Sequence, residues 1–210
     1  MNRTPFINLI GIVAPLRADN IDTDQIIPSR EMKRVGRDGL SDGLFAGQRY
    51  LNPGSRAPNP EFALNKPEYK NVSILLSGTN FGCGSSREHA VWALAEYGVR
   101  CIIAESFGEI FYSNCGQNGI LPIALAKCDI DILENFTQED PQKNKLTVNL
   151  EKQSITAETE SSLNLSFNTK AYQKRLLVGG LDPIGLTLER KDEIAEFITE
   201  DSRRRPWIYK

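Results

Sequence analysis

The residues best suited to chemistry lie in the stretch 82–89, Gly-Cys-Gly-Ser-Ser-Arg-Glu-His. An apolar run at 72–76 precedes this stretch, and a helical pattern at 90–97 follows it. The glycines are therefore expected to connect a strand to the start of a helix. Free backbone N–H groups and the positive end of the helix dipole make such a junction favourable for an anion.

Arg87 is the unexpected residue of this stretch, because we place it in the first helical turn, where a cation opposes the helix dipole. A guanidinium beside free N–H groups suits bidentate binding of a carboxylate or phosphate, and the hydroxyls of Ser85 and Ser86 are adjacent. A purely structural alternative is a capping box, with Ser85 as the N-cap and Glu88 at the third helical position. The two roles are compatible, so both stay open.

Other chemistries fit the stretch less well. It lacks the Gly-Lys-Ser/Thr ending of a P-loop, and Arg87 stands where a dinucleotide fingerprint needs glycine. Ser85 and His89 are four residues apart, but the Gly-x-Ser-x-Gly elbow of serine hydrolases is absent. We interpret His89, the single histidine, as a structural group that could hold the turn.

Composition excludes several classes of partner. The 210 residues carry a formal net charge of −2, which gives no electrostatic case for nucleic acid or an anionic membrane surface. We find no N-terminal signal and no apolar stretch of roughly 18 residues, so a cytoplasmic location is expected. We interpret the basic run 203–205 as a solvated tail. The four cysteines form no C-x-x-C pair, so we expect no metal site and mostly buried thiols.

An acidic segment follows the first predicted strand, 6–15. Residues 19–28 contain Asp19, Asp22 and Asp24, but the glycine and glutamate of a calcium-binding EF-hand loop are missing. The structural interpretation is a capped turn that Pro28 ends. The functional alternative is that Asp24 faces a site and orients a basic group there.

The order of elements predicts an α/β fold. Strands at 72–76, 101–105 and 120–125 alternate with helices at 90–97 and 107–115, which favours a parallel sheet whose ligands bind at the carboxyl ends of its strands. Further helices and three antiparallel strands are expected after residue 128. Residues 29–71 show little regular periodicity, and their aromatic residues indicate a packed binding loop.

Two blocks of the sequence resemble a known family. Residues 22–28 (Asp-Thr-Asp-Gln-Ile-Ile-Pro) and 80–90 (Asn-Phe-Gly-Cys-Gly-Ser-Ser-Arg-Glu-His-Ala) are similar to the signatures of 3-isopropylmalate dehydratase small subunits, in the aconitase superfamily. Similarity continues at 102–107, 114–121 and 180–188, so it covers most of the chain.

The resemblance implies a fold and a reaction. The expected fold is a swivelling β/β/α domain over 1–210, with a mostly parallel sheet flanked by helices and additional antiparallel strands. The expected activity is that of a hydro-lyase of leucine biosynthesis, which converts 2-isopropylmalate to 3-isopropylmalate by removing and re-adding water. The resemblance also implies that a separate large subunit carries the [4Fe–4S] cluster, and that this chain is inactive without it.

The resemblance also assigns residues. By position, Ser85 corresponds to the catalytic base, Ser86 and Arg87 to contacts with a substrate carboxylate, and Asp24 to an aspartate that lines the same site. One more arginine is expected after the aspartate block, with Arg30 and Arg34 as candidates. The segment 29–71 would then sense the side chain of the dicarboxylate substrate.

Alternatives remain at this stage. Within the same class, the substrate could instead be citraconate, citramalate or homoaconitate. Outside it, the chain could be a phosphate-binding module, or an accessory protein whose glycine turn is only structural.

Overall fold

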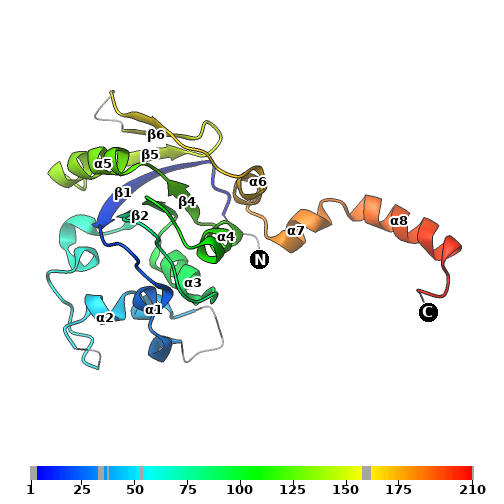
Figure 1. Ribbon diagram of the computed structural model, residues 1–210, viewed down its shortest axis with the longest axis horizontal. Helices are drawn as coiled ribbons and strands as arrows, with labels where there is room; N and C mark the ends of the chain where they lie inside the picture. The colour runs from blue at the N-terminus through cyan, green and yellow to red at the C-terminus, as the bar shows by residue number, and fades with distance from the viewer. Residues whose placement is uncertain (1–3, 33–35, 37, 53, 158–161, 210) are drawn as a thin grey trace.

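A single mixed sheet organises the computed structural model, which describes residues 4–32, 36, 38–52, 54–157 and 162–209 (Figure 1). Its strand order among these residues is β4-β3-β2-β1-β5-β6-β7. The parallel half consists of β4 (Leu121–Ala124), β3 (Cys101–Ala104), β2 (Val72–Ser77) and β1 (Asn8–Leu16). The antiparallel half consists of β5 (Leu146–Asn149), β6 (Ser154–Ala157) and β7 (Asn164–Ser166). Both halves were predicted, and the sheet confirms the expected fold class.

Helices connect the strands and line both faces of the sheet. The longer helices of the body are α3 (His89–Tyr97), α4 (Glu109–Gln117), α5 (Lys127–Glu139) and α6 (Ala171–Gly179). Two helices follow the body, α7 (Pro183–Leu188) and α8 (Lys191–Arg204). Short helical turns occupy α1 (Thr23–Ile26), α2 (Ala46–Arg49), Ser29–Glu31, Ser41–Gly43, Ala63–Asn65 and Pro67–Tyr69.

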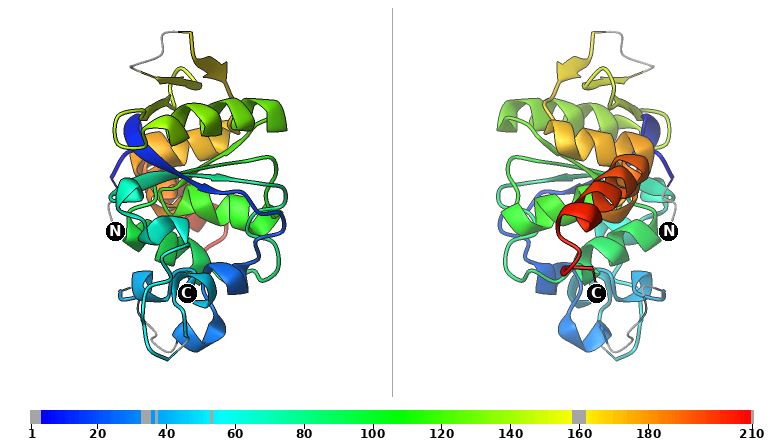
Figure 2. Two further views of the ribbon diagram at one scale, coloured as in Figure 1. Left: turned by 90° about the vertical axis from the view of Figure 1, so that its left-hand side faces the viewer. Right: turned by 90° about the vertical axis from the view of Figure 1, so that its right-hand side faces the viewer.

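The strand residues divide between two cores because successive side chains point to opposite faces of a sheet. Along β2, Leu75 belongs to the core beneath α3 and α4, whereas Ile74 and Leu76 belong to the core beneath α5 and α6. Along β3, Ile102 is in the first core and Ile103 is in the second. The two layers are visible in Figure 2, where α5 lies on one side of the strands and α1 and α2 on the other.

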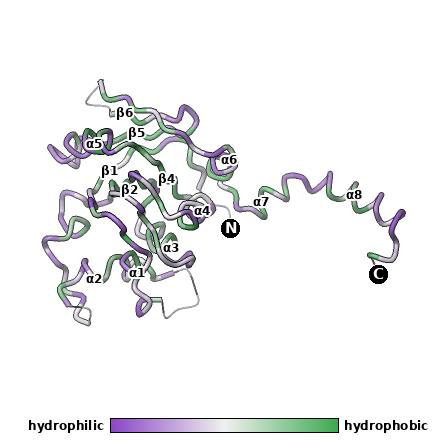
Figure 3. Tube along the Cα trace, viewed as in Figure 1, coloured by the Kyte–Doolittle hydropathy of each residue, from purple (hydrophilic) through white to green (hydrophobic). Residues whose placement is uncertain are grey.

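The C-terminal helices depart from this layered body. In Figure 1, α7 and α8 extend away from the sheet, and Figure 3 shows that hydrophobic and hydrophilic residues alternate along α8. Arg205 forms a two-pronged ion pair with Asp201, with both N···O distances at 2.7 Å. Residues 203–205 are exposed, as predicted for a solvated run, and a carboxylate one helical turn away also binds the guanidinium of Arg205.

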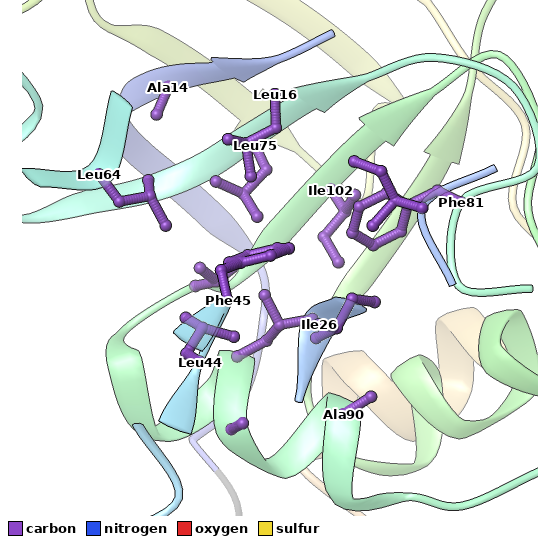
Figure 4. Packing of buried hydrophobic residues seen from close by; sticks show 14 of the residues in the cluster. Ala14, Leu16, Ile26, Leu44, Phe45, Leu64, Leu75, Phe81, Ala90 and Ile102 are labelled. Carbon is purple, nitrogen blue, oxygen red and sulfur yellow. The ribbon is translucent and has the colours of Figure 1, made fainter. Parts of the chain in front are cut away.

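The segment 29–71 is irregular but packed, as predicted. In the part of this segment that the structure describes, helices and strands are limited to the short helical turns named above. Phe45 is fully buried, its ring centroid lies 5.8 Å from that of Phe62, and its N–H donates to the Ile26 carbonyl at 2.7 Å. Figure 4 shows Phe45 and Ile26 in the same cluster as Leu75. The carboxylate of Glu96 on α3 accepts the N–H groups of Gly39 and Ser41, which fixes this segment to the body.

The start of α3 differs from the prediction. The helix begins at His89 with Glu88 as its N-cap, so Ser85 is not the cap and Arg87 is not in the first turn. In the expected capping box the Ser85 N–H would donate to the Glu88 carboxylate, but both groups are engaged elsewhere. The Ser85 N–H donates to Thr23 Oγ1 at 3.0 Å, and Glu88 Oε1 accepts from Asn118 Nδ2 at 3.0 Å. The residues 85–87 are thereby held as a loop before the helix.

Candidate active site

The loops after β1 and β2 form the candidate site, because parallel strands bring their carboxyl ends to one edge of the sheet. The two loops pair by backbone hydrogen bonds that continue beyond the strands. These are Asn20 N–H to Thr79 O at 2.9 Å, Gly82 N–H to Ile21 O at 2.7 Å, and Thr23 N–H to Cys83 O at 2.9 Å. This pairing places the acidic block beside the glycine-rich block, which are about 60 residues apart in sequence.

The loop after β3 supports this arrangement from the other side. The N–H of Phe81 donates to the Ser106 carbonyl, and the N–H of Gly108 donates to the Phe81 carbonyl, both at 2.9 Å. Phe81 itself is fully buried, with its ring edge against Phe107 and Phe111. The glycine-rich loop is thus fixed between two neighbouring loops.

Asp19 contributes to the pairing through its carboxylate. Its Oδ1 accepts the N–H of Thr79 at 2.8 Å, and this bond lowers the pKa of Asp19 below its ordinary value of 3.8. A carboxyl whose folded pKa is lowered contributes stability above its unfolded pKa and loses it as the pH falls through the folded pKa.

We therefore expect Asp19→Asn to lower the urea midpoint at pH 6, and the difference from the wild type to shrink as the pH falls below about 4. Urea unfolding of the two proteins at pH 6 and again below about pH 4 measures the difference between their midpoints. A difference that stays constant with pH would show that the charge of Asp19 has no part in the bond.

Gly82 requires the absence of a side chain. Its φ is +73°, and a Cβ atom there would lie 2.2 Å from the ring of Phe111. An L-residue at this position would be strained and would also displace a buried ring.

We expect Gly82→Ala to destabilise the protein by about 1–3 kcal/mol, the usual cost of overpacking a core. The matched control is Gly47→Ala, because a Cβ at Gly47 would meet no atom within 4 Å. Urea unfolding should show a lower midpoint for the first variant and little change for the second. Equal midpoints would contradict the close approach to Phe111.

Three predicted site residues form one chain of contacts. Arg87 Nε donates to Ser85 Oγ at 3.0 Å, and Arg87 Nη2 donates to Asp24 Oδ1 at 3.0 Å. The side chains of Arg87 and Asp24 are 43% and 60% exposed, so this ion pair contributes little to stability. The pair instead orients the guanidinium across the mouth of the site, as the functional interpretation of Asp24 requires.

Thr23 holds the serine in place, and sequence analysis missed this role. Its side chain is buried, and its Oγ1 accepts the backbone N–H of Ser85 at 3.0 Å. Two asparagines were also missed, since Asn114 Nδ2 donates to the Ser86 carbonyl at 3.4 Å and Asn118 binds Glu88. The sequence did contain one indication of this role for Thr23, namely its position next to Asp24 in the acidic segment 19–28.

The remaining predicted residues are less closely joined. Ser86 is adjacent to Ser85 and exposed. Arg30 is 45% exposed and contacts Glu31 at 3.4 Å; within the described residues no hydrogen bond or ion pair joins Arg30 to Ser85, Arg87 or Asp24. Arg34 lies outside the described residues.

His89 packs its ring against that of Trp92, with centroids 4.8 Å apart. Its Nδ1 is buried and has no hydrogen-bond partner in the described part of the chain. The histidine is therefore part of the packing, but the hydrogen bond that would hold the turn is not formed.

The cysteines do not gather into a ligand set. Cys101 and Cys115 are fully buried, and burial raises the pKa of both thiols, which disfavours the thiolate that binds metals. Cys83 is half-buried and Cys128 is exposed, so the expectation of mostly buried thiols holds for two of the four. Among the described residues, no three His, Cys, Asp or Glu side chains are placed to hold a metal ion.

The crevice beside Arg87 is small. Its empty volume is ≈ 140 Å³, and it is lined by Thr23, Asp24, Ile27, Met32, Arg87 and Ala90. Arg87 and Asp24 both line this crevice and both side chains are exposed, so on this chain the site is open to solvent.

Comparisons with known proteins identify the family of this fold. Residues 3–128 match the family described as Aconitase C-terminal domain. The crystal structure of 3-isopropylmalate dehydratase from Methanocaldococcus jannaschii shares the fold, with a TM-score of 0.64 and 24% identity over 90% of this chain and 99% of that chain. The described helices include none with the length and apolar character needed to cross a membrane.

Full-length relatives are more similar. The 3-isopropylmalate dehydratase small subunit of Cupriavidus necator is 49% identical over 205 residues, covering 98% of both chains. The protein of the same name from Rhizobium meliloti is 48% identical over 205 residues, covering 96% of this chain and 98% of its own. The chain therefore belongs to the family of 3-isopropylmalate dehydratase small subunits.

Proposed function

We propose that this chain is the small subunit of a 3-isopropylmalate dehydratase, a hydro-lyase of leucine biosynthesis. The enzyme removes water from 2-isopropylmalate and adds it back to give 3-isopropylmalate. The single observation that carries the proposal is the contact chain Ser85–Arg87–Asp24, because it joins a candidate base to a carboxylate-binding group. The substrate assignment comes from relatives that are similar over nearly the whole chain and are named 3-isopropylmalate dehydratase small subunits.

Ser85 is the proposed base that takes the proton from the substrate carbon. A serine hydroxyl is a weak base and needs activation. The Arg87 guanidinium donates to Ser85 Oγ at 3.0 Å, and the Arg87 backbone N–H lies 3.4 Å from the same oxygen. Both donors would stabilise an alkoxide at Oγ, and more strongly once closure of the site excludes water.

Arg87 also has donors left for the substrate. Of its five N–H donors, the bonds to Ser85 and Asp24 use two, so the others are available to a carboxylate. The exposed hydroxyl of Ser86 is proposed to assist at the same carboxylate. A dicarboxylate needs a second cationic contact, for which Arg30 remains the candidate within the described residues.

The large subunit is proposed to complete the site and to carry the [4Fe–4S] cluster. When bound, the cluster iron supplies a Lewis acid for the departing hydroxyl. The exposed side chains of Arg87 and Asp24 fit a surface that a second chain covers. The buried thiols Cys101 and Cys115 fit a role in packing. The packed segment 29–71 is proposed to sense the substrate side chain.

Two further expectations accompany the function and stay predictions. One is that the chain acts as a single swivelling domain over 1–210, closing on the large subunit. The other is that the enzyme works in the cytoplasm.

Reconstitution tests the proposed function. The chain is mixed with the cluster-loaded large subunit of the same organism, and formation of the unsaturated intermediate is followed by ultraviolet absorbance. We expect turnover of 2-isopropylmalate from the mixture and none from this chain alone. Turnover of citraconate or homoaconitate in place of 2-isopropylmalate would move the substrate assignment to a related dehydratase.

A further inference from the structure

The C-terminal arm, which we define as residues 181–209, is the feature that the catalytic account leaves unexplained. It follows α6 at Gly180, whose φ of +61° turns the chain away, and it comprises α7, α8 and a short tail (Figures 1 and 2). An ion pair between Arg175 on α6 and Glu189, at 2.7 Å, links the base of the arm to the body. Beyond this base the arm projects from the sheet.

Apolar side chains are concentrated on the arm. Within the described residues, 14 large hydrophobic side chains are exposed, and 8 of them lie in the arm, although it holds only 29 of the 210 residues. On α8, Ile194, Phe197 and Ile198 recur at the spacing of one helix face. Ile184 and Leu188 on α7 are 70% and 59% exposed, and Trp207 in the tail is 67% exposed. A surface of this kind marks an interaction site.

The arm is preformed for binding. Asp201 lies on the same face as the apolar side chains, but its carboxylate accepts two bonds from Arg205 at 2.7 Å and one from the Tyr209 hydroxyl at 2.8 Å. These bonds fold the tail back onto α8 and satisfy the charge at that position. A partner therefore meets an ordered surface and pays less ordering entropy on binding.

Charge indicates the chemistry of the partner. From Lys191 to Asp201, α8 carries five carboxylates and one lysine, and Glu193 and Glu200 flank the apolar face; the cations Arg203 and Arg204 follow only in the last turn. In a second copy packed alongside in the same direction, these acidic groups would face one another, and like charges across an interface are costly. A partner with an apolar groove bordered by cationic side chains fits better.

The length of the arm and the relatives point to the same partner. The arm has 29 residues, comparable to the roughly 20–30 residues that each side of a standard interface contributes. It lies outside the matched aconitase domain, 3–128, yet alignments to small subunits cover 98% of this chain and so include it. The arm is thus shared with proteins that are named as one subunit of two.

We propose that the C-terminal arm docks along an apolar groove, bordered by basic side chains, on the large subunit of the enzyme. The inference rests on the proposed function, because it takes the large subunit as the partner. The arm would hold the two subunits together at a place separate from the Ser85–Arg87–Asp24 surface.

The test measures binding and turnover separately. The Kd between the full-length chain and the large subunit is measured by isothermal titration calorimetry, for the wild type, Phe197→Asp, Glu193→Lys and the control Ile132→Asp. Ile132 lies on α5 and is 51% exposed, comparable to the arm residues. We expect Phe197→Asp to weaken binding about 30-fold or more, as loss of an interface hot spot does. Glu193→Lys should weaken binding less, and the control should leave it unchanged.

The outcomes separate this inference from the proposed function. At saturating small subunit, Phe197→Asp should recover near-normal turnover, since the catalytic surface is intact. A Kd for Phe197→Asp within about threefold of the wild type would overturn the docking site, even if the wild-type mixture is active. Sedimentation of the chain alone tests whether this surface binds a second copy of the chain instead. A dimer that Phe197→Asp converts to a monomer would assign the surface to a second copy and overturn the proposal.

Discussion

Ser85→Ala is expected to lower kcat by roughly 10²–10⁴-fold, the usual contribution of a positioned general base. The physical reason is that Ser85 Oγ accepts from Arg87 Nε and is the candidate proton acceptor, whereas alanine leaves no group to take the proton. The measurement is the initial rate with 2-isopropylmalate in the reconstituted enzyme. Assembly with the large subunit should persist, because Thr23 holds the backbone N–H of residue 85, which alanine retains.

A second serine provides the control for this substitution. Ser113 is an exposed residue of α4 that accepts a hydrogen bond from Gln117 and makes no contact with Ser85 or Arg87. Ser113→Ala should therefore keep the wild-type rate. If Ser85→Ala also kept it, the catalytic assignment of Ser85 would be wrong.

Arg87→Lys is expected to raise KM by about 10- to 100-fold and to lower kcat as well. Hydrogen bonds to charged groups contribute about 1.5–3 kcal/mol, which corresponds to that range in affinity. The ammonium group of lysine cannot reach Ser85, Asp24 and a carboxylate at once, because it lacks the planar fork of the guanidinium. A fall in kcat is expected in addition because Arg87 contacts Ser85 Oγ at 3.0 Å.

Steady-state kinetics of the reconstituted enzyme separate the two effects. Arg100→Lys serves as the control, since the Arg100 guanidinium donates to the Gly119 and Thr4 carbonyls, outside both the candidate site and the C-terminal arm. Asp24→Asn should shift KM in the same direction as Arg87→Lys, but less, because it removes only the group that orients the guanidinium. Unchanged KM and kcat for Arg87→Lys would show that Arg87 does not contact the substrate.

The sheet was predictable because its signals are local and strong. Apolar runs at β2, β3 and β4 alternate with helical patterns, and parallel strands need such crossover connections. The family resemblance assigned Asp24 and Arg87 to one site, and the fold brings them together because β1 and β2 are parallel neighbours. The backbone N–H groups of Thr23 and Gly82, which donate to carbonyls of the facing loop, hold the two loops together.

The capping box shows where local reasoning fails. Ser85 and Glu88 have the right types and spacing, yet Thr23 and Asn118 bind them from distant parts of the chain. Tertiary hydrogen bonds therefore replaced a local one, and no pattern within residues 82–89 could reveal this. The burial of the irregular segment around Phe45 was indicated by its aromatic residues, but its attachment to Glu96 depends on the folded positions of both.

The C-terminal arm could not be recognised from sequence because its pattern is that of any amphipathic helix. Ile194, Phe197 and Ile198 predict a face that packs on something, and only the fold shows that the body does not cover it. The interaction surface is therefore visible only after the core has been accounted for.

The most direct test of the central claim, that this chain supplies one half of a shared active site, is a competition titration. The large subunit is held at a fixed concentration with a constant amount of wild-type chain, and Ser85→Ala chain is added while turnover of 2-isopropylmalate is followed. We predict that turnover falls toward zero as the variant replaces the wild type, with a midpoint near equal concentrations of the two chains. Turnover that persists when the variant saturates the large subunit would contradict the account.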